Sequence, residues 1–185
     1  MVGTCLAFVL YIVYDVNSVL LKNRFLQSFF ALGTVLLAVS TIGCFLSQWD
    51  ACLMRRQPVF MLGLIPGAAG FFLMIRSLFF SLPFDETYLN PRQKPPVYDA
   101  GMYALCRHPG VVWLCLMYFG LALSGGSLLC TLLSVAASLL DILYEVFQDC
   151  WTFPRTFSNY GAYQKSTPFL IPTWESIQKA WRTRK

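Results

Sequence analysis

The chain has 185 residues, of which 57% are hydrophobic and 12% are charged. Typical globular proteins have roughly 45–50% apolar and about 25% charged residues, so this composition excludes an ordinary soluble domain and predicts an integral membrane protein. The net charge of +5 is compatible with a nucleic-acid binder, but the basic residues are dispersed and lie at segment boundaries. Cytoplasmic loops of a membrane protein explain that distribution better, and no nucleic-acid partner is expected.

Five apolar segments follow one another along the chain, at residues 2–21, 25–46, 58–82, 110–123 and 127–147. A transmembrane helix needs about 20 predominantly apolar residues. The first segment lacks a basic stretch before it and a clear cleavage site, so a retained span is predicted there and not a signal peptide. The fourth is short, and Ser124-Gly125-Gly126 joins it to the fifth, which predicts an antiparallel hairpin. The expected fold is an all-α, integral membrane helical bundle of about five transmembrane helices, with a C-terminal helical hairpin and a cytoplasmic tail.

Single residues within the first three segments are predicted to be structural. The glycines and alanines of residues 66–70 are expected to allow close helix packing, and Pro66 is expected to kink its helix. Asp15 and Asn17 lie close to the basic residue Lys22, and Arg76 lies near the end of the third segment. Structural roles near the membrane interface are expected for these polar side chains.

Basic residues predict the orientation of the bundle. One side carries the loop between the first and second segments, the loop at residues 83–109 and the C-terminal tail, with these basic residues: Lys22, Arg24, Arg92, Lys94, Arg107, Arg155, Lys165, Lys179, Arg182, Arg184 and Lys185. The other side offers Arg55 and Arg56. The positive-inside rule places the first group in the cytoplasm and the N-terminus outside. A bacterial inner membrane is the expected location.

Acidic residues form a stripe along the fifth segment and just beyond its end. Asp141, Glu145 and Asp149 are spaced i, i+4 and i+8, so they share one face of a helix. A helix that emerges into solvent explains Asp149, but Asp141 lies about two turns deeper in the segment. Because a carboxylate within a span usually faces the bundle interior or a water-filled cavity, a polar cavity beside this helix is expected.

The motif Arg107-His108-Pro109-Gly110 opens the fourth segment and holds the only histidine of the chain. Histidine has an unperturbed pKa near neutrality, roughly 6.5, which suits a functional site. A boundary marker is an equally good explanation, since proline favours the first helical turn and arginine is common at a cytoplasmic boundary. The seven cysteines are scattered and show no metal-ligand spacing, so no metal site is expected.

The order of motifs in the second half of the chain is more specific than any one of them. The stretch GMYALCRHP at residues 101–109 precedes a short apolar segment and a glycine-containing turn, and YGAYQKSTPFLIP at residues 160–172 follows the acidic helix. This order, over about residues 98–173, resembles the isoprenylcysteine carboxyl methyltransferase family and its bacterial relatives. Those proteins are integral-membrane methyltransferases that use S-adenosylmethionine. The resemblance implies a cofactor-binding half at residues 83–185, after three N-terminal transmembrane helices at residues 1–82.

Carried over by position, the resemblance implies two groups of site residues. The cofactor-binding group comprises Tyr103, Arg107, His108, Pro109, Tyr160 and Tyr163. The catalytic group comprises Glu145 and Asp149. Three positions of this chain depart from the family's pattern: Val111 stands in place of a tyrosine, Trp113 in place of a glycine, and Gln148 in the first place of a Glu-Glu pair. Glu145, one helical turn earlier, is the acid that would substitute for the missing glutamate.

The resemblance also implies roles for these residues. Arg107 would hold the cofactor's carboxylate, His108 would hydrogen-bond the cofactor, and an acid would bind its amine or sulfonium. The acceptor would be a small or lipophilic carboxylate, thiol or amine. A carboxylate or thiolate acceptor needs no general base, whereas an amine or hydroxyl would need Glu145 or Asp149.

Two other functions remain open from the sequence. One is an NADPH-dependent membrane reductase of the sterol or 5α-steroid type, although the 83–109 loop offers few basic residues for a dinucleotide. The other is a non-catalytic membrane protein with a degenerate pocket, which the three departures favour. Under any of these functions, residues 174–185 are expected to form a basic amphipathic helix that contacts membrane lipids.

Overall fold

The structure is a computed structural model that describes residues 1–49, 57–80 and 95–183. Every regular element in those three ranges is a helix. The long helices there are α1 (Val2–Val16), α3 (Phe29–Ser47), α5 (Gln57–Ile75), α7 (Pro109–Gly125) and α8 (Leu128–Phe147). The all-α helical bundle expected from hydropathy is therefore confirmed.

Shorter elements extend the long helices or connect them. Three of these are π-helical turns: η1 (Asn17–Leu21), η2 (Arg76–Phe80) and η4 (Gln148–Thr152). The others are short α-helices: α2 (Arg24–Gln27), α6 (Met102–Leu105), α9 (Phe153–Thr156), α10 (Tyr160–Ser166) and α11 (Trp174–Arg182).

Within the described residues, four helical segments are long and apolar enough to cross a membrane: Val2–Leu21, Arg24–Ser47, Pro58–Leu78 and Leu128–Thr156. A further apolar helix, Pro109–Gly125, has 17 residues. These five helices coincide with the five predicted spans, and they indicate an integral membrane protein. The predicted end of the third span, at residue 82, lies outside the described residues, as do Arg55, Arg56, Arg92, Lys94, Arg184 and Lys185.

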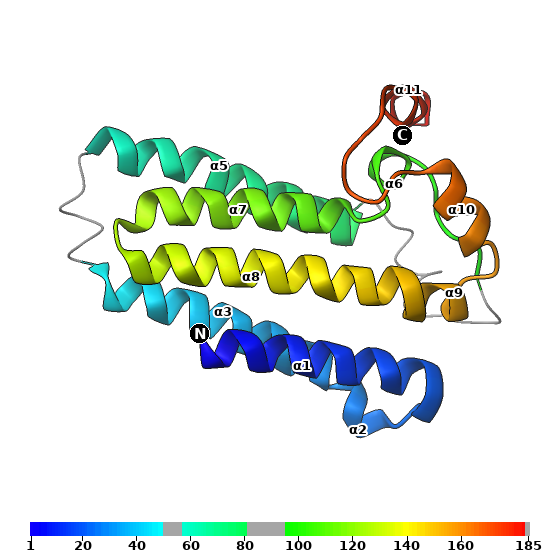
Figure 1. The fold of residues 1–185 in the computed structure, drawn as a ribbon, viewed down its shortest axis with the longest axis horizontal. Coiled ribbons are helices and arrows are strands. Elements are labelled where there is room, and N and C mark those ends of the chain that lie inside the picture. The colour runs from blue at the N-terminus through cyan, green and yellow to red at the C-terminus, as the bar shows by residue number, and fades with distance from the viewer. Residues whose placement is uncertain (50–56, 81–94, 184–185) are drawn as a thin grey trace.

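The long helices lie side by side, with α8 in the middle of the bundle (Figure 1). Helix α8 contacts α7 on one side and both α1 and α3 on the other, and α5 packs on the far side of α7. The acidic stripe of α8 therefore runs along the helix that has the most neighbours in the bundle.

Helices α5 and α7 approach so closely that Gly63, Gly70 and Gly120 have no room for a side chain. A Cβ atom added at Gly120 of α7 would overlap the backbone of Gly63 and Gly67 in α5, and one added at Gly70 would overlap the backbone of Met117. This confirms the predicted role of the small residues in the third span. Pro66 lies inside α5 without ending it.

The turn between α7 and α8 forms the predicted hairpin. Gly126 takes the left-handed conformation with φ 67°, which ends α7. The side chain of Ser127 then accepts a hydrogen bond from the Cys130 N–H at 3.2 Å and caps the start of α8. Because the turn is tight, the start of α7 and the end of α8 lie at the same end of the bundle, as Figure 1 shows.

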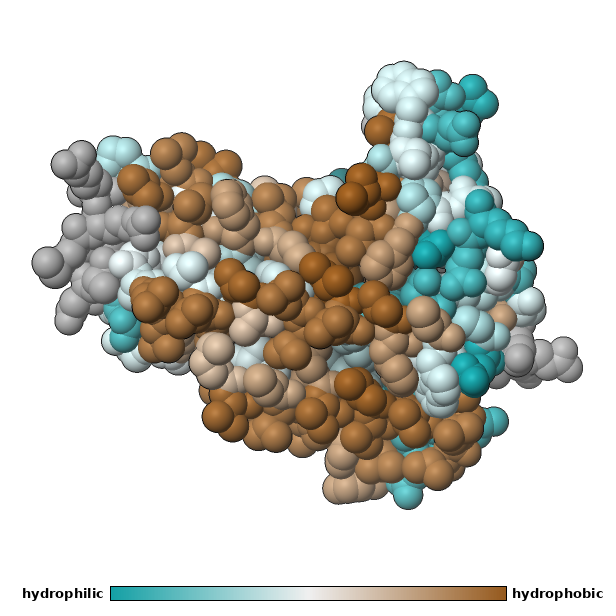
Figure 2. Space-filling model, in the orientation of Figure 1, coloured by the Kyte–Doolittle hydropathy of each residue, from teal (hydrophilic) through white to brown (hydrophobic). Residues whose placement is uncertain are grey.

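The surface divides into an apolar belt and a polar end. Figure 2 shows hydrophobic residues over most of the bundle and hydrophilic residues gathered where α6, α10 and α11 lie in Figure 1. Such a belt is the surface expected of helices that face lipid. The polar end contains the residues that the sequence singled out.

Candidate functional site

The start of α7 positions the Arg107-His108-Pro109 motif. Pro109 is the first residue of α7, and His108 precedes it in a non-helical conformation. The N–H groups of Arg107 and His108 donate to the carbonyl oxygens of Pro168 at 2.9 Å and Phe169 at 3.3 Å. The segment after α10 therefore holds the motif in place through its backbone.

Asp149 of η4 is the centre of a polar network at this end of the bundle. Its Oδ1 accepts from the Tyr160 hydroxyl at 2.5 Å and lies 3.2 Å from Nε2 of His108. Its Oδ2 accepts from Nη2 of Arg107 at 3.0 Å and from Nε2 of Gln164 at 3.1 Å. Residues from α7's start, η4 and α10 are thus joined through one buried carboxylate.

His108 lies between two carboxylates and two aromatic rings. Its Nδ1 is 2.5 Å from Oε2 of Glu145, and its ring stacks on Phe153 and meets Phe169 edge-on. Burial by itself lowers the pKa of His108, but its hydrogen bonds to the Asp149 and Glu145 carboxylates outweigh burial and raise that pKa to about 9. At neutral pH the ring is therefore an imidazolium that donates from both nitrogens, and it is not available as a general base.

Arg107 is held by both backbone and side-chain groups. Its Nη1 donates to the carbonyl oxygens of Gln164 at 2.8 Å and Thr167 at 3.0 Å. Its Nε lies 2.9 Å from Oδ1 of Asp149, an ion-pair distance at which the N–H is not aimed to make a hydrogen bond. Among the described residues, Nη1 and Nη2 both have hydrogen-bond acceptors, and the buried Nε has only its ion-pair contact with Asp149.

The three tyrosines of the predicted site occupy two places. Tyr160 belongs to the Asp149 network, and burial together with the hydrogen bond to Asp149 raises its pKa. Tyr163 donates to the backbone carbonyl of Tyr103 at 2.6 Å, and the Tyr103 hydroxyl donates to the carbonyl of Ser77 at 3.3 Å. Tyr103 and Tyr163 therefore hold the segment before Arg107 through backbone hydrogen bonds, while Tyr160 contacts the Asp149 carboxylate directly.

Two contributors to this region were not predicted as site residues. Gln164 donates to both the side chain and the backbone carbonyl of Asp149. Asp15 of α1 is buried and accepts from Gln148 at 2.8 Å and from Thr152 at 3.4 Å. The sequence did contain a signal for Asp15, an acid within a span, although nothing in it pointed to the pairing with Gln148.

The positions that depart from the family's pattern lie on the inner faces of their helices. Gln148 turns toward Asp15 and Tyr144. Val111 is buried at the start of α7, and the Trp113 Nε1 atom is buried without a hydrogen-bond partner among the described residues. Of the two positions that correspond to the acidic pair, Asp149 alone is an acid. Glu145, one turn earlier, contacts the other ring nitrogen of His108.

Asp141 and Asp149 of the acidic stripe are buried and Glu145 is partly exposed, and the outer end of the stripe is filled by protein groups. Asp141 is buried one turn below Glu145 on α8. Around Asp149, the space where the sequence predicted a cavity holds the side chains of Arg107, His108, Tyr160 and Gln164. This end of the bundle therefore combines two cations, two carboxylates and a phenol within a single hydrogen-bonded network.

If the hydrocarbon core of the membrane begins near Leu128, the network lies near the opposite membrane surface. At about 1.5 Å per residue, Asp149 lies roughly 32 Å along the helix from Leu128, which is close to the approximately 30 Å thickness of a bilayer's hydrocarbon core. A charged network is stable there because water and lipid headgroups are within reach.

Comparison of the chain with protein-family models, with curated proteins and with solved structures gave no match. The functional interpretation therefore rests on the residues, their geometry and the resemblance described above.

Proposed function

We propose that this chain is an integral membrane methyltransferase that takes its methyl group from S-adenosylmethionine. One observation carries the proposal: Arg107, His108, Glu145, Asp149 and Tyr160 form one network at one end of the bundle. These are five of the eight residues that the resemblance implied, and they come from segments up to 53 residues apart. Apolar patterning of the helices alone gives no reason for these five polar side chains to contact one another.

The network has the charges that the cofactor requires. S-adenosylmethionine carries a carboxylate, an ammonium and a sulfonium. Arg107 is the cation that suits the carboxylate, because a guanidinium binds carboxylates through charge-assisted hydrogen bonds. Its Nε and Nη2 lie against Asp149, so the cofactor's carboxylate would share or replace that contact. Glu145 is partly exposed and suits the ammonium. On this arrangement Asp149 and Tyr160 orient Arg107 and His108.

The bound cofactor would supply an already activated methyl group, whose bond to sulfur breaks as its bond to the acceptor's nucleophilic atom forms, leaving a thioether. The chain's own contribution is orientation and electrostatics. Because His108 is an imidazolium at neutral pH, an amine or hydroxyl acceptor would have to give its proton to a carboxylate, Glu145 or Asp149, whichever does not hold the cofactor. A carboxylate or thiolate acceptor would need no such base.

We also propose that the network faces the cytoplasm of a bacterial cell, where soluble cofactors are available. Helix α2, which carries Arg24, lies at the same end of the bundle as α6, α10 and α11 (Figure 1). Basic residues Lys165 and Lys179 lie on α10 and α11. Positive charge gathered at one end of a bundle supports a cytoplasmic location for that end, and the N-terminus would then lie outside.

A non-catalytic membrane protein is the second candidate. It is favoured by one observation: protein groups already satisfy both oxygens of Asp149. A network that is complete without a ligand is also what a structural cluster would show.

Equilibrium binding to the purified full-length protein in detergent separates these functions. We expect S-adenosylmethionine to bind saturably and to compete with its demethylated product, and NADPH not to bind. Saturable binding of NADPH alone would instead identify a reductase. Binding of neither compound would overturn the methyltransferase proposal and favour the non-catalytic candidate.

A further inference from the structure

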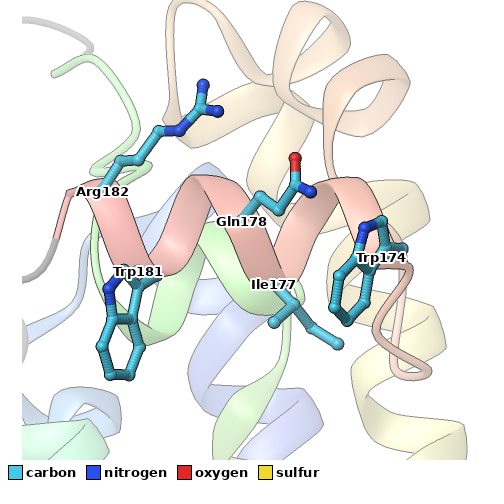
Figure 3. Close-up of a pocket in the computed structure, with 5 residues that line it drawn as sticks. All are labelled: Trp174, Ile177, Gln178, Trp181 and Arg182. Atoms are coloured by element: carbon cyan, nitrogen blue, oxygen red, sulfur yellow. The ribbon is translucent and has the colours of Figure 1, made fainter.

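Helix α11 presents an apolar face whose side chains are exposed. Trp174, Ile177 and Trp181 lie on one side of the helix. Trp174 is 73% exposed and Trp181 is 71% exposed. Figure 3 shows these three side chains pointing the same way, with Gln178 and Arg182 beside them along the adjacent edge of the helix. Together the five residues line a shallow hollow of about 360 Å³. Two exposed tryptophans on a nine-residue helix are unusual for a surface that faces water.

The fold fixes this helix in place, so the exposure is not the fraying of a loose end. Thr173 and Ser176 form a reciprocal capping box at the start of α11. Lys179 pairs with Asp99 at 3.0 Å, and Thr183 accepts from the Gly101 N–H at 3.1 Å. Helix α11 also packs on α6. The apolar face is therefore held outward by contacts on the other sides of the helix.

The direction of α11 matches a membrane surface. Figure 1 looks almost along the axis of α11, while α5, α7 and α8 run across the view. If the long helices cross a membrane, α11 lies nearly in the membrane plane. In Figure 2 its hydrophilic atoms face away from the apolar belt of the bundle. A helix with this orientation would place tryptophans in the headgroup region, where their amphipathic rings are favoured.

Charge indicates which partner the face accepts. Residues 174–185 contain four basic residues, Lys179, Arg182, Arg184 and Lys185, and one acidic residue, Glu175. Lys179 is paired with Asp99 on another side of the helix, and Arg182 lies beside the apolar face. A second copy of the chain would bring its own Arg182 to this face, where the like charges would repel each other. An anionic lipid surface provides both the negative charge and the apolar phase, and it already adjoins the bundle.

We propose that α11 is a docking surface for anionic phospholipid, with Trp174, Ile177 and Trp181 inserted into the headgroup region and Arg182 bound to lipid phosphate. The docked helix holds the segment that leads to the site. Asp99 and Gly101, which contact α11, immediately precede α6, and α6 carries Tyr103 and ends two residues before Arg107. Docking is therefore expected to order α6 as well as α11.

Hydrogen–deuterium exchange of the full-length protein in nanodiscs tests this proposal. The nanodiscs are made of phosphatidylcholine with or without phosphatidylglycerol. We expect the amides of residues 174–183, and with them residues 101–105, to exchange severalfold more slowly when phosphatidylglycerol is present. Arg182→Gln should remove most of that difference, and Trp181→Ser should speed exchange in both lipids. The matched control Arg155→Gln alters an exposed arginine that packs over Trp151, and it should retain the full difference.

The outcomes separate docking from its alternatives. Equal exchange in the two lipids, with no effect of Trp181→Ser, would overturn the proposal. Protection that rises with protein concentration in detergent without lipid would instead assign the face to a second copy. Unchanged exchange in α7 confirms that each variant is folded. The measurement uses no S-adenosylmethionine, so its failure would leave the proposed methyltransferase function untouched.

Discussion

At the scale of single residues, Asp149 determines how the charges of the site are arranged. It is buried, and it contacts Arg107 and His108, two cations that would each be costly to bury alone. Its neighbours Tyr160 and Gln164 satisfy the remaining lone pairs. A buried charge cluster that is complete in this way is tolerated, whereas the same cluster with one partner removed is strongly destabilised.

We expect Asp149→Asn to destabilise the protein strongly. The substitution leaves Arg107 and the His108 imidazolium without their shared counter-ion, which should cost roughly 3–5 kcal/mol and lower the midpoint of thermal unfolding by roughly 10 °C for a chain of this size. Asp99→Asn is the matched control, because the Asp99–Lys179 pair is largely exposed and such pairs contribute at most about 1 kcal/mol. Thermal unfolding in detergent compares the two variants, and equal shifts would contradict the assignment of Asp149 as the centre of the network.

The ionisation of His108 predicts how stability depends on pH. Its folded-state pKa of about 9 lies above the ordinary value of 6.5, so its contribution is fully present below about pH 6.5 and is lost as the pH rises through about 9. A shift of that size corresponds to about 3 kcal/mol. The difference in thermal stability between wild type and His108→Gln should therefore be largest in mild acid and shrink toward alkaline pH. A difference that grew with pH would show that the ring is neutral in the folded protein.

Sequence reasoning predicted the charged members of the site but not all of their partners. Arg107 and His108 were identifiable because polar residues at the start of an apolar segment are conspicuous. Glu145 and Asp149 were identifiable from their i, i+4 spacing within a span. Gln164 carried no such signal, since a polar residue in a polar tail is ordinary. The pairing of Asp15 with Gln148 could not be predicted either, because it depends on which helix packs beside α8.

At the scale of secondary-structure elements, the α5–α7 interface supports the start of α7. Gly63, Gly67 and Gly70 of α5 face the backbone of α7 near Gly120 and Met117. Because no side chains separate the two helices there, the backbones pack directly and restrict the position of α7. The positions of His108 and Arg107, at the N-terminal end of α7, are restricted in the same way.

Gly120→Ala tests this interface. The added methyl group would overlap the backbone of Gly67 and Gly63, so the two helices must separate; overpacking of this kind typically costs 1–3 kcal/mol. Gly43→Ala is the control, because a Cβ at Gly43 meets nothing within 4 Å, and alanine favours a helix by about 1 kcal/mol over glycine. The midpoint temperature of thermal unfolding should therefore fall for Gly120→Ala and stay level or rise for Gly43→Ala. Equal behaviour of the two variants would exclude close α5–α7 packing.

The long helices could be predicted from hydropathy, because about 20 apolar residues leave the chain few alternatives in a membrane. The acidic stripe predicted a helix as far as Asp149. Its continuation through Thr152 to α9 was not predicted, since Gln148 and Asp149 resemble the solvated end of a helix when read from sequence. The short helices α6 and α10 were also missed. Each is held by contacts between distant segments, such as the hydrogen bond from Tyr163 to Tyr103. Such contacts cannot be predicted from the local sequence.

At the scale of the whole molecule, the chain separates an apolar bundle from a polar end that gathers distant segments. The loop before α7, the end of α8, and helices α10 and α11 meet there, although they are dispersed over the second half of the sequence. The hairpin of α7 and α8 makes this possible by returning the chain to the same end. On the proposed function, the bundle anchors and orients the site, and α11 ties the site to the lipid surface.

The central claim is that this network binds S-adenosylmethionine, and calorimetric titration of the full-length protein in detergent tests it most directly. Wild type should bind saturably, and Arg107→Gln should weaken binding by at least tenfold, since a charge-assisted hydrogen bond contributes roughly 1.5–3 kcal/mol. Arg155→Gln, which removes an exposed arginine on α9, should bind as wild type does. Absence of saturable binding by wild type, or equal affinity of folded Arg107→Gln and wild type, would contradict the account.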